Sequence, residues 1–275
     1  MSKYIGNIIT RIPTLPTPSS AKGIWQLDDI ADYKSKGIWP ASNPDPYWVD
    51  VTMLLHGNGT NNSTTFTDSS LYNLSLTRTG TPVISTAQSK FGGASMYFTG
   101  TSQYLNVPSD YSSVAFGTGD FTVEFWSYIA TAVTGYQFLF NIAHTNGNFD
   151  IRYGDSGFGN KLQVGINTNS TSSTWSCALT KAGDAGVWKH IAFTRSGTTC
   201  RLFVNGTIQN INNGINPSTY PSTSFTSSTS VTGVTSASIG GASTHTSQVY
   251  LDEFRITKGI ARYTANFTTE TAEFP

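Results

Sequence analysis

Two adjacent carboxylates, Asp252 and Glu253, stand in the stretch VYLDEFRITKGIARY, which otherwise has the composition of a β-strand. A carboxylate pair can hydrolyse a glycosidic bond or bind a cation, provided that both side chains face a common cleft. Neighbouring side chains of a strand point to opposite faces, so Asp252 is predicted to share a face with Phe254, and Glu253 with Arg255. The spacing therefore excludes a catalytic pair formed by these two residues.

The two carboxylates have separate interpretations. Glu253 beside Arg255 predicts an exposed ion pair that contributes little to stability. Asp252 is expected among apolar side chains, where it needs a cation or hydrogen-bond donors to offset its desolvation. Two alternatives stay open for Asp252: a bound Ca²⁺, which prefers oxygen ligands, or a carboxylate that caps backbone N–H groups.

The composition favours an all-β protein with a polar, uncharged surface. Charged residues make up 12% of the 275 residues, and the formal net charge is zero. A chain without excess positive charge has no net electrostatic attraction to nucleic acid or to anionic membranes. There is no apolar run long enough for a membrane span and no signal-peptide pattern in residues 1–11, so we expect no membrane insertion. Cys177 and Cys200 are predicted to be reduced thiols.

Residues 1–48 differ in character from the rest of the chain and are predicted to form an attachment arm. RIPTLPTPSS favours an extended segment, and the following GIWQLDDIADYKSKGIWP has the spacing, charges and final glycine of one short helix. The apolar side chains Trp25, Leu27, Ile30 and Trp39 of this arm need a partner surface. The alternatives are the chain's own β domain and a neighbouring subunit, and we favour the subunit.

Residues 49–275 are predicted to form an antiparallel β-sandwich or jelly roll, because short alternating segments separated by turn residues run to the end of the chain. Ser-Gly-Thr at 196–198 and Asn205-Gly206 are predicted hairpin turns. The Ser/Thr/Pro-rich stretch 212–235 is predicted to be a surface loop. The expected strands are VTMLLH, SMYFTG, QYLNVP, DFTVEFWSYI, YQFLFNIA, FDIRYG, KLQVGIN, WKHIAFTRSG, TCRLFVNG, SASIGG and QVYLDEFRIT.

Several motifs in this block carry a resemblance to a known family. LLHGNGTNNSTTFTDSS, KFGGASMYFTG, FGTGDFTVEFW, WKHIAFTRSGTTCRLFVNG and LDEFRITKGIARYTANFT occur in this order over nearly all of residues 51–275. Together they resemble the laminin-G-like jelly roll of the concanavalin A-like superfamily, in a form similar to one found in structural proteins of tailed bacteriophages. The resemblance implies the fold, whereas it only suggests a function, because one fold serves many functions.

The resemblance also implies one structural Ca²⁺. Laminin-G-like domains often hold calcium through an aspartate in the segment that matches LDEFRI and another in the segment that matches TDSSLYN. These aspartates are Asp252 and Asp68 in this sequence. Many relatives have glycine where this chain has Leu71, so the loop after Asp68 departs from the family pattern.

The resemblance provides a test for hydrolase activity as well. Related glucanases carry Glu-x-Asp-x-Glu on one strand, whereas GDFTVEFWSY has Thr122 at the middle position and only Glu124 well inside the strand. The histidines are scattered and are predicted to be structural or exposed; they are His56, His144, His190 and His245. We therefore predict no catalytic residues and no enzyme activity.

These observations predict a non-enzymatic structural protein of a phage virion, made in the host cytoplasm and attached to other virion proteins by its N-terminal arm. The jelly roll would face outward for adhesion to a host-surface glycan, as part of a tail fibre or appendage, or would decorate the capsid. A homo-oligomer is expected. The main alternative function is a free-standing carbohydrate-binding module. A glycoside hydrolase is the third alternative. Aromatic candidates for sugar contacts are Tyr136, Tyr153, Phe158, Trp175 and Tyr220.

Overall fold

The computed structural model describes residues 45–130, 136–154, 162–166, 176–180, 185–210, 222–242 and 246–275. The chain divides into two compact units, Met1–Pro46 together with Pro275, and Tyr47–Phe274. Every described strand belongs to the second unit. The predicted anchor residues of the arm, which are Trp25, Leu27, Ile30 and Trp39, lie outside the described residues.

The first sheet is antiparallel and is built around the long strand β16. Its order is β13-β12-β11-β6-β16-β4-β3, with β1 also pairing with β16 and β14 with β12. We call it the nine-stranded sheet. Its strands are β1 (Val51–Leu55), β3 (Val83–Ser85), β4 (Ser95–Thr101), β6 (Phe121–Ile129), β11 (Lys189–Ser196), β12 (Thr199–Val204), β13 (Thr207–Ile208), β14 (Phe225–Thr226) and β16 (Thr246–Lys258).

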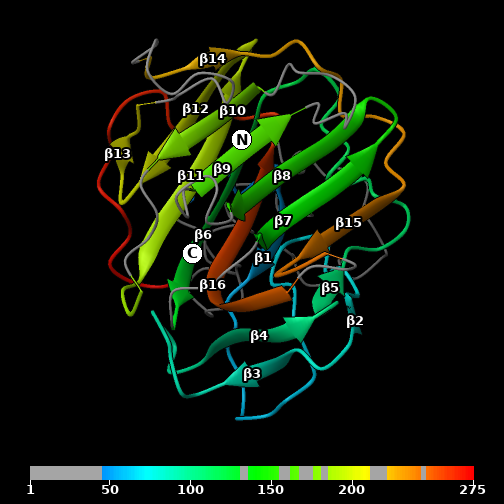
Figure 1. Cartoon of the computed structure of the whole chain (residues 1–275), viewed down its shortest axis with the longest axis vertical. Coiled ribbons are helices and arrows are strands. Elements are labelled where there is room, and N and C mark those ends of the chain that lie inside the picture. Colours follow the sequence, from blue (N-terminus) through cyan, green and yellow to red (C-terminus); the bar gives the residue numbers. More distant parts are fainter. Residues whose placement is uncertain are drawn as a thin grey trace, which may run out of the picture. The chain divides into compact units, whose positions relative to one another are not determined.

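The second sheet is also antiparallel and has the order β10-β9-β8-β7-β15-β5-β2. Its strands are β2 (Thr77–Thr79), β5 (Tyr104–Asn106), β7 (Gln137–His144), β8 (Gly147–Tyr153), β9 (Leu162–Ile166), β10 (Ser176–Thr180) and β15 (Ser236–Ile239). In Figure 1 the tip of β8 lies in front of β16, and β7 and β15 lie beside it. The predicted all-β sandwich is confirmed, and the described helical structure is one 3₁₀ turn at Trp48–Asp50.

The core lies between the two sheets and accounts for the two-residue period of the strands. On β6 the alternate residues Phe121, Val123 and Phe125 are fully buried in it, and Phe149 and Ile151 face them from β8. Burying a side chain of this size stabilises a fold by about 1.5–3 kcal/mol. A one-residue slip of either strand would turn all of these groups away from the core, so the core fixes the register.

All the segments expected as strands are strands in the structure, namely β1, β4, β5, β6, β7, β8, β9, β11, β12, β15 and β16. Both predicted hairpin turns are also present. Gly197 (φ 57°) lies between β11 and β12, and Asn205 (φ 49°) with Gly206 (φ 74°) lies between β12 and β13. Positive φ values at such positions match the right-handed twist of a hairpin.

The stretch 212–235 is more ordered than the predicted loop in its described part, which starts at residue 222. It contains β14, Val231 forms a backbone bridge with Gly117, and the Val231 side chain is buried in the core. Cys200 is a free thiol in the core, and the side chain of Cys177 lies outside the described residues. Across the described ranges, no helix has the length and apolar character needed to cross a membrane.

Candidate functional site

A β-bulge in β16 sets the directions of Asp252 and its neighbours. The register with β6 shifts between Asp252 and Arg255, where two residues of β16 oppose one residue of β6. Phe254 consequently points into the core, whereas Asp252 stays on the outer face of the nine-stranded sheet. The prediction that Asp252 and Phe254 share a face is therefore wrong, because the extra residue reverses the alternation.

Glu253 is the bulge residue in the left-handed region (φ 51°), a conformation that favours glycine. Its side chain is fully buried, its two carboxylate oxygens lie 3.0 and 3.1 Å from His56 Nδ1, and Oε2 accepts a hydrogen bond of 2.7 Å from the Phe274 amide. The predicted exposed pair with Arg255 is therefore wrong. Burial alone would lower the pKa of His56, but the hydrogen bond and charge of Glu253 raise it above 6.5.

Asp252 is fully buried and caps backbone N–H groups, which is one of the two alternatives that the sequence leaves open. Oδ2 accepts hydrogen bonds from the amides of Lys90 (2.7 Å) and Phe91 (3.1 Å), and Oδ1 accepts one from the amide of Glu253 (3.0 Å). Burial raises the pKa of the carboxyl to about 7, although the three donors act in the opposite direction. Asp252 thus fastens the loop before β4 to the bulge of β16.

Asp68 is also buried and organises its own turn. Oδ1 accepts from the amides of Leu54 (2.8 Å) and Ser70 (3.0 Å), and Oδ2 accepts from the Ser70 hydroxyl (2.8 Å) and the Leu74 amide (2.8 Å). These donors occupy the oxygens that a cation needs, so the arrangement does not fit a calcium ion shared with Asp252. Within the described ranges, no three or more His, Cys, Asp or Glu residues are grouped to hold a metal. Calcium binding remains a prediction from the resemblance, and a melting temperature that falls on chelation would support it.

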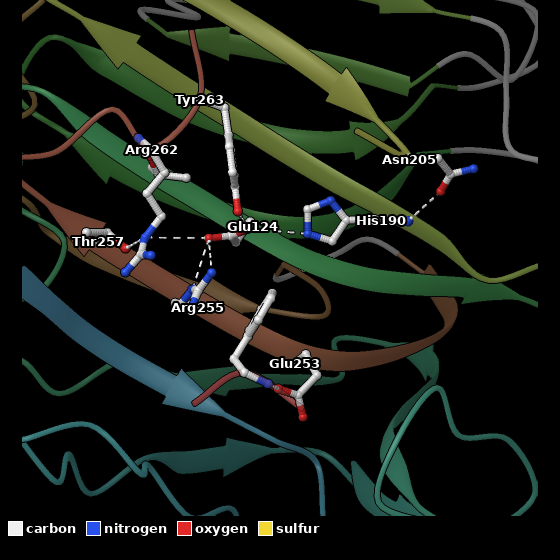
Figure 2. Close-up of polar contacts among 10 residues, drawn as sticks. Glu124, His190, Asn205, Glu253, Arg255, Thr257, Arg262 and Tyr263 are labelled. Carbon is white, nitrogen blue, oxygen red and sulfur yellow. Dashed lines mark hydrogen bonds and ion pairs between the residues drawn. The ribbon is translucent and has the colours of Figure 1, made fainter. Parts of the chain in front are cut away.

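Glu124 lies on the outer face of β6 at the centre of a buried charged cluster (Figure 2). Oε1 accepts a hydrogen bond of 3.0 Å from Arg255 Nε and lies 2.9 Å from Arg255 Nη2 and 3.7 Å from Arg262 Nε. Oε2 lies 3.3 Å from His190 Nε2 and accepts a hydrogen bond of 2.8 Å from the Tyr263 hydroxyl. We call these five residues the Glu124 cluster. His190 is therefore buried and paired with the acid rather than scattered away from it.

The electrostatics of the Glu124 cluster suit a structural role. Burial would raise the pKa of Glu124, but Arg255, His190 and Arg262 outweigh it and lower the pKa to about 2. The acid of a glycosidase instead needs a raised pKa and access to the leaving-group oxygen. Glu124 is fully buried and stays ionised at neutral pH, so its carboxylate can balance guanidinium charge but is not placed to protonate a sugar.

A C-terminal segment, residues 259–274, covers this half of the outer face. Thr122 Oγ1 donates a hydrogen bond of 3.0 Å to the Ile260 carbonyl, and Thr194 Oγ1 donates one of 2.9 Å to the Tyr263 carbonyl. Figure 2 shows Tyr263 of this segment pointing at Glu124. The part of the strand on which the resemblance places glucanase acids is therefore occupied by the chain's own residues.

Four aromatic side chains lie next to one another on the same outer face, at the other end of β6. Tyr97 on β4 and Tyr128 on β6 both pair with Tyr250 on β16, and Trp188 comes immediately before β11. Ring centroids are 4.2 Å apart for Tyr97–Tyr250, 5.8 Å for Tyr128–Tyr250 and 5.5 Å for Tyr128–Trp188. We call these residues the aromatic row. Tyr250 is buried, the other three are partly exposed, and the adjacent Val187 is exposed.

The sugar-contact candidates named from the sequence are placed differently. Tyr153 is in the core, its hydroxyl lies 3.2 Å from that of Ser127, and burial raises its pKa to about 12. Tyr136 stacks on the guanidinium of Arg152, whose central carbon is 4.4 Å from the ring centroid. Phe158, Trp175 and Tyr220 lie outside the described residues. Sequence reasoning missed the aromatic row, although alternation with core residues shows that its tyrosines point outward.

The strand orders of the two antiparallel sheets are those of a lectin-like jelly roll. On the outer face of the nine-stranded sheet, residues 259–274 cover one half, and the aromatic row lies on the other half. The model of the Concanavalin A-like lectin/glucanases superfamily, in its laminin G form, matches residues 99–260, and the chain belongs to this superfamily. The resemblance seen in the sequence is thus confirmed for the family. No curated protein sequence matches the chain.

Solved structures with similar folds include domains of larger proteins. The binding domain of Paraclostridial Mosquitocidal Protein 1 is 17% identical with a TM-score of 0.54, and that of botulinum neurotoxin DC, in complex with rat synaptotagmin II, is 13% identical with a TM-score of 0.52. The matches cover 77% and 78% of this chain, which spans about half (49%) of each toxin chain. Domain 4 of AbnA, a GH43 extracellular arabinanase from Geobacillus stearothermophilus, in complex with arabinotriose, is 17% identical with a TM-score of 0.53, over 77% of this chain and 93% of that one.

Proposed function

We propose that this protein is a non-enzymatic glycan-binding module and that the aromatic row contacts the sugar. The row is the observation that carries the proposal. Its four rings lie on the side of the sheet that faces away from the core, so packing of the sandwich does not account for them. Aromatic rings offer an apolar surface to the C–H groups of a sugar, and the tyrosine hydroxyl and indole N–H add hydrogen bonds. A contiguous set of this kind on an outer face is typical of an interaction surface.

The three similar structures support a binding role. Domain 4 of the arabinanase is in complex with arabinotriose, and the toxin domains are binding domains. These likenesses concern the fold, so the aromatic row rather than the likeness identifies the surface on this chain. The burial and low pKa of Glu124 support the absence of hydrolysis, because the acid that the resemblance would assign to catalysis is held as a structural anion.

The setting that we propose is a phage particle, where the jelly roll serves in host adhesion or capsid decoration. Support comes from the sequence resemblance to virion structural proteins and from the apolar residues Trp25, Leu27, Ile30 and Trp39 of the predicted arm. Removal of residues 1–44 is expected to abolish incorporation into particles while the remaining β unit still binds glycan. Incorporation that survives the deletion would sink the attachment role but not the glycan-binding role.

The glycan-binding role is tested by screening the full chain on a glycan array and comparing variants by calorimetry. Trp188→Ala and Tyr128→Ala are each expected to weaken binding about ten-fold or more, as for aromatic residues that a bound partner covers. Tyr72→Ala is the matched control, since Tyr72 is 49% exposed and lies outside the aromatic row. Equal affinity for all three variants would contradict the assignment of this surface.

A further inference from the structure

A pocket of about 220 Å³ opens beside His56, where the ends of β1, β3 and β4 meet the loop around residues 66–69. At about 30 Å³ per molecule it corresponds to roughly seven waters, and it is smaller than the ~300–1,000 Å³ typical of drug-sized ligands. A ligand of this pocket is therefore the size of one sugar ring or smaller. The pocket is separate from the aromatic row, because Met96 lines it while the next residue, Tyr97, points to the opposite face of β4.

The pocket has an apolar floor and a polar rim. The floor is formed by Leu55, Ile84 and Met96, each no more than 1% exposed, and the half-buried Phe66 adds a wall. The rim carries the imidazole of His56 and the exposed residues Thr67 and Ser69. A ligand that fits both the apolar floor and the polar rim has a small apolar group joined directly to a hydrogen-bonding group.

The buried Glu253 fixes the orientation of His56. Because Nδ1 faces a carboxylate, it carries the proton, and Nε2 is the ring nitrogen that does not contact Glu253. His56 lines the pocket and 20% of its side chain is exposed, so we expect Nε2 to be the nitrogen that meets a ligand. The charge of Glu253 balances that of a protonated His56, and Glu273 accepts a hydrogen bond of 2.8 Å from Asn58 on the same rim. The site therefore has no excess positive charge, which disfavours an anionic ligand.

The backbone strain at Glu253 is a further indication that the residues around His56 form a binding site. A non-glycine residue in a left-handed conformation costs about 1–3 kcal/mol, and the bulge would accept glycine without that cost. Glu253 also ties the Phe274 amide, so its carboxylate has a structural task in addition to orienting the imidazole. Polarised histidines of this kind are common where a ligand is bound or a proton is moved.

We propose that this pocket binds the acetamido group of an N-acetylated sugar, with the methyl group on the apolar floor and the amide at the rim. An acetamido group is uncharged, has an apolar methyl, and carries both a donor and an acceptor for His56, Thr67 and Ser69. This is a second binding site, independent of the aromatic row and of the glycans that the row takes. It would give the protein a preference among neutral sugars that an aromatic surface alone does not provide.

The probe is N-acetylglucosamine, titrated into the full chain while the His56 imidazole and Met96 methyl signals are followed by NMR. Glucose, which lacks the acetamido group, and glucosamine, which lacks the acetyl group, are the ligand controls. We expect N-acetylglucosamine to shift both signals and the controls to bind at least ten-fold more weakly. Ser69→Trp should fill the mouth of the pocket and weaken N-acetylglucosamine binding at least ten-fold, whereas Ser109→Trp, at an exposed serine away from the pocket, should not.

A second variant separates this site from the proposed function. Trp188→Ala is expected to leave the N-acetylglucosamine shifts unchanged, and Ser69→Trp is expected to leave binding at the aromatic row unchanged. His56→Gln, which keeps a hydrogen-bonding side chain but removes the ring, should weaken N-acetylglucosamine binding at least five-fold. The proposal is overturned if glucose shifts the two signals equally, if no sugar shifts them, or if Ser69→Trp binds as well as Ser109→Trp.

Discussion

Glu124 illustrates how the surroundings of a residue decide what its chemistry can do. The side chain has the type and position of a catalytic acid on a lectin-like strand, yet two guanidinium groups, an imidazole and a phenol enclose it. A buried carboxylate with so many partners is costly to remove, because the groups around it lose the charge that balances theirs. At this position the charge contributes to stability rather than to a reaction.

Replacing Glu124 with glutamine is expected to lower the free energy of unfolding by about 3–5 kcal/mol, because Arg255 and Arg262 would lose the charge of Glu124 in a buried site. Denaturant unfolding of the purified variant measures the loss. Glu273→Gln is the matched control, since Glu273 is an exposed carboxylate that accepts one hydrogen bond from Asn58, and its loss should stay below about 1 kcal/mol. Equal losses for the two variants would contradict the structural role of the Glu124 cluster.

The low pKa of Glu124 also predicts how stability changes in acid. The pKa falls from 4.5 to about 2 on folding, so its contribution is fully present above pH 4.5 and is lost as the pH falls through 2. The difference is on the order of 3 kcal/mol. Asp252, whose pKa is raised to about 7, acts in the opposite direction between pH 7 and 4, so the loss should appear only below about pH 4.5. Unfolding curves of the native chain should show this loss, and those of Glu124→Gln should not.

Part of the residue-level chemistry could be predicted from the sequence. The alternative in which Asp252 caps backbone amides follows from a carboxylate in a largely apolar strand, and the structure has it. Glu253 could not be predicted, because a bulge has no signal in a single sequence unless glycine occupies it. Here a glutamate does, so simple alternation gave it the wrong face and the wrong partner.

The C-terminal segment, residues 259–274, shows at the scale of an element how an irregular stretch can be essential. It forms no strand, but it supplies Arg262 and Tyr263 to the Glu124 cluster, and the buried Phe274 packs with Val51 and Leu54. Its hydrogen bonds join β6, β11 and β13 to residues more than fifty positions away in the sequence. The segment therefore acts as a third layer over one half of the nine-stranded sheet.

Tyr263→Phe tests this layer with the removal of one oxygen atom. The hydroxyl donates to a buried carboxylate, and a hydrogen bond to a charged group contributes about 1.5–3 kcal/mol, which is the expected loss in unfolding free energy. Tyr111→Phe is the comparison, because its hydroxyl donates to the Thr235 carbonyl in an exposed position. The measured loss there should be smaller, and a larger loss for Tyr111→Phe would count against the importance of the covering segment.

Strands with a regular two-residue period could be predicted because the core selects their alternating apolar residues. The strands that were missed are two to five residues long, too short for an alternation to be seen. The covering segment could not be predicted for a different reason. IARYTANFT has no period, and its place depends on contacts with β6 and β11, which a single sequence does not reveal.

At the scale of the whole molecule, one outer face serves two purposes. The half near Glu124 is closed by the chain's own C-terminal segment, and the other half presents the aromatic row. The closed half adds buried charge and hydrogen bonds that hold the central strands rigid. The aromatic row then projects from a fixed platform, which lowers the entropic cost of ordering the rings in the glycan binding that we propose.

Cys200 provides a probe of the stability of the whole molecule. Its thiol is fully buried in the core, and burial raises its pKa to about 12, so both access and the reactive thiolate are suppressed in the folded protein. We expect alkylation of Cys200 to proceed only through global unfolding, at a rate that rises steeply across the denaturant transition. Peptide mass spectrometry that resolves Cys200 from Cys177 measures this rate. Rapid labelling of Cys200 in native buffer would contradict a closed core.

The bulge in β16 has a consequence for how this protein tolerates insertions and deletions. Removing Glu253 would leave Asp252 opposite Trp126 and Phe254 opposite Phe125, so each side chain on either side of the gap would keep its face. Deletion of a residue inside a regular strand instead turns the following residues over. We therefore expect deletion of Glu253 to yield a folded sandwich that lacks its contacts with His56, Phe274 and the Asp252 carboxylate, whereas deletion of Val123 should prevent folding. Circular dichroism and thermal unfolding of the two variants would show whether the sandwich folds without the bulge residue Glu253 but does not fold without the regular strand residue Val123.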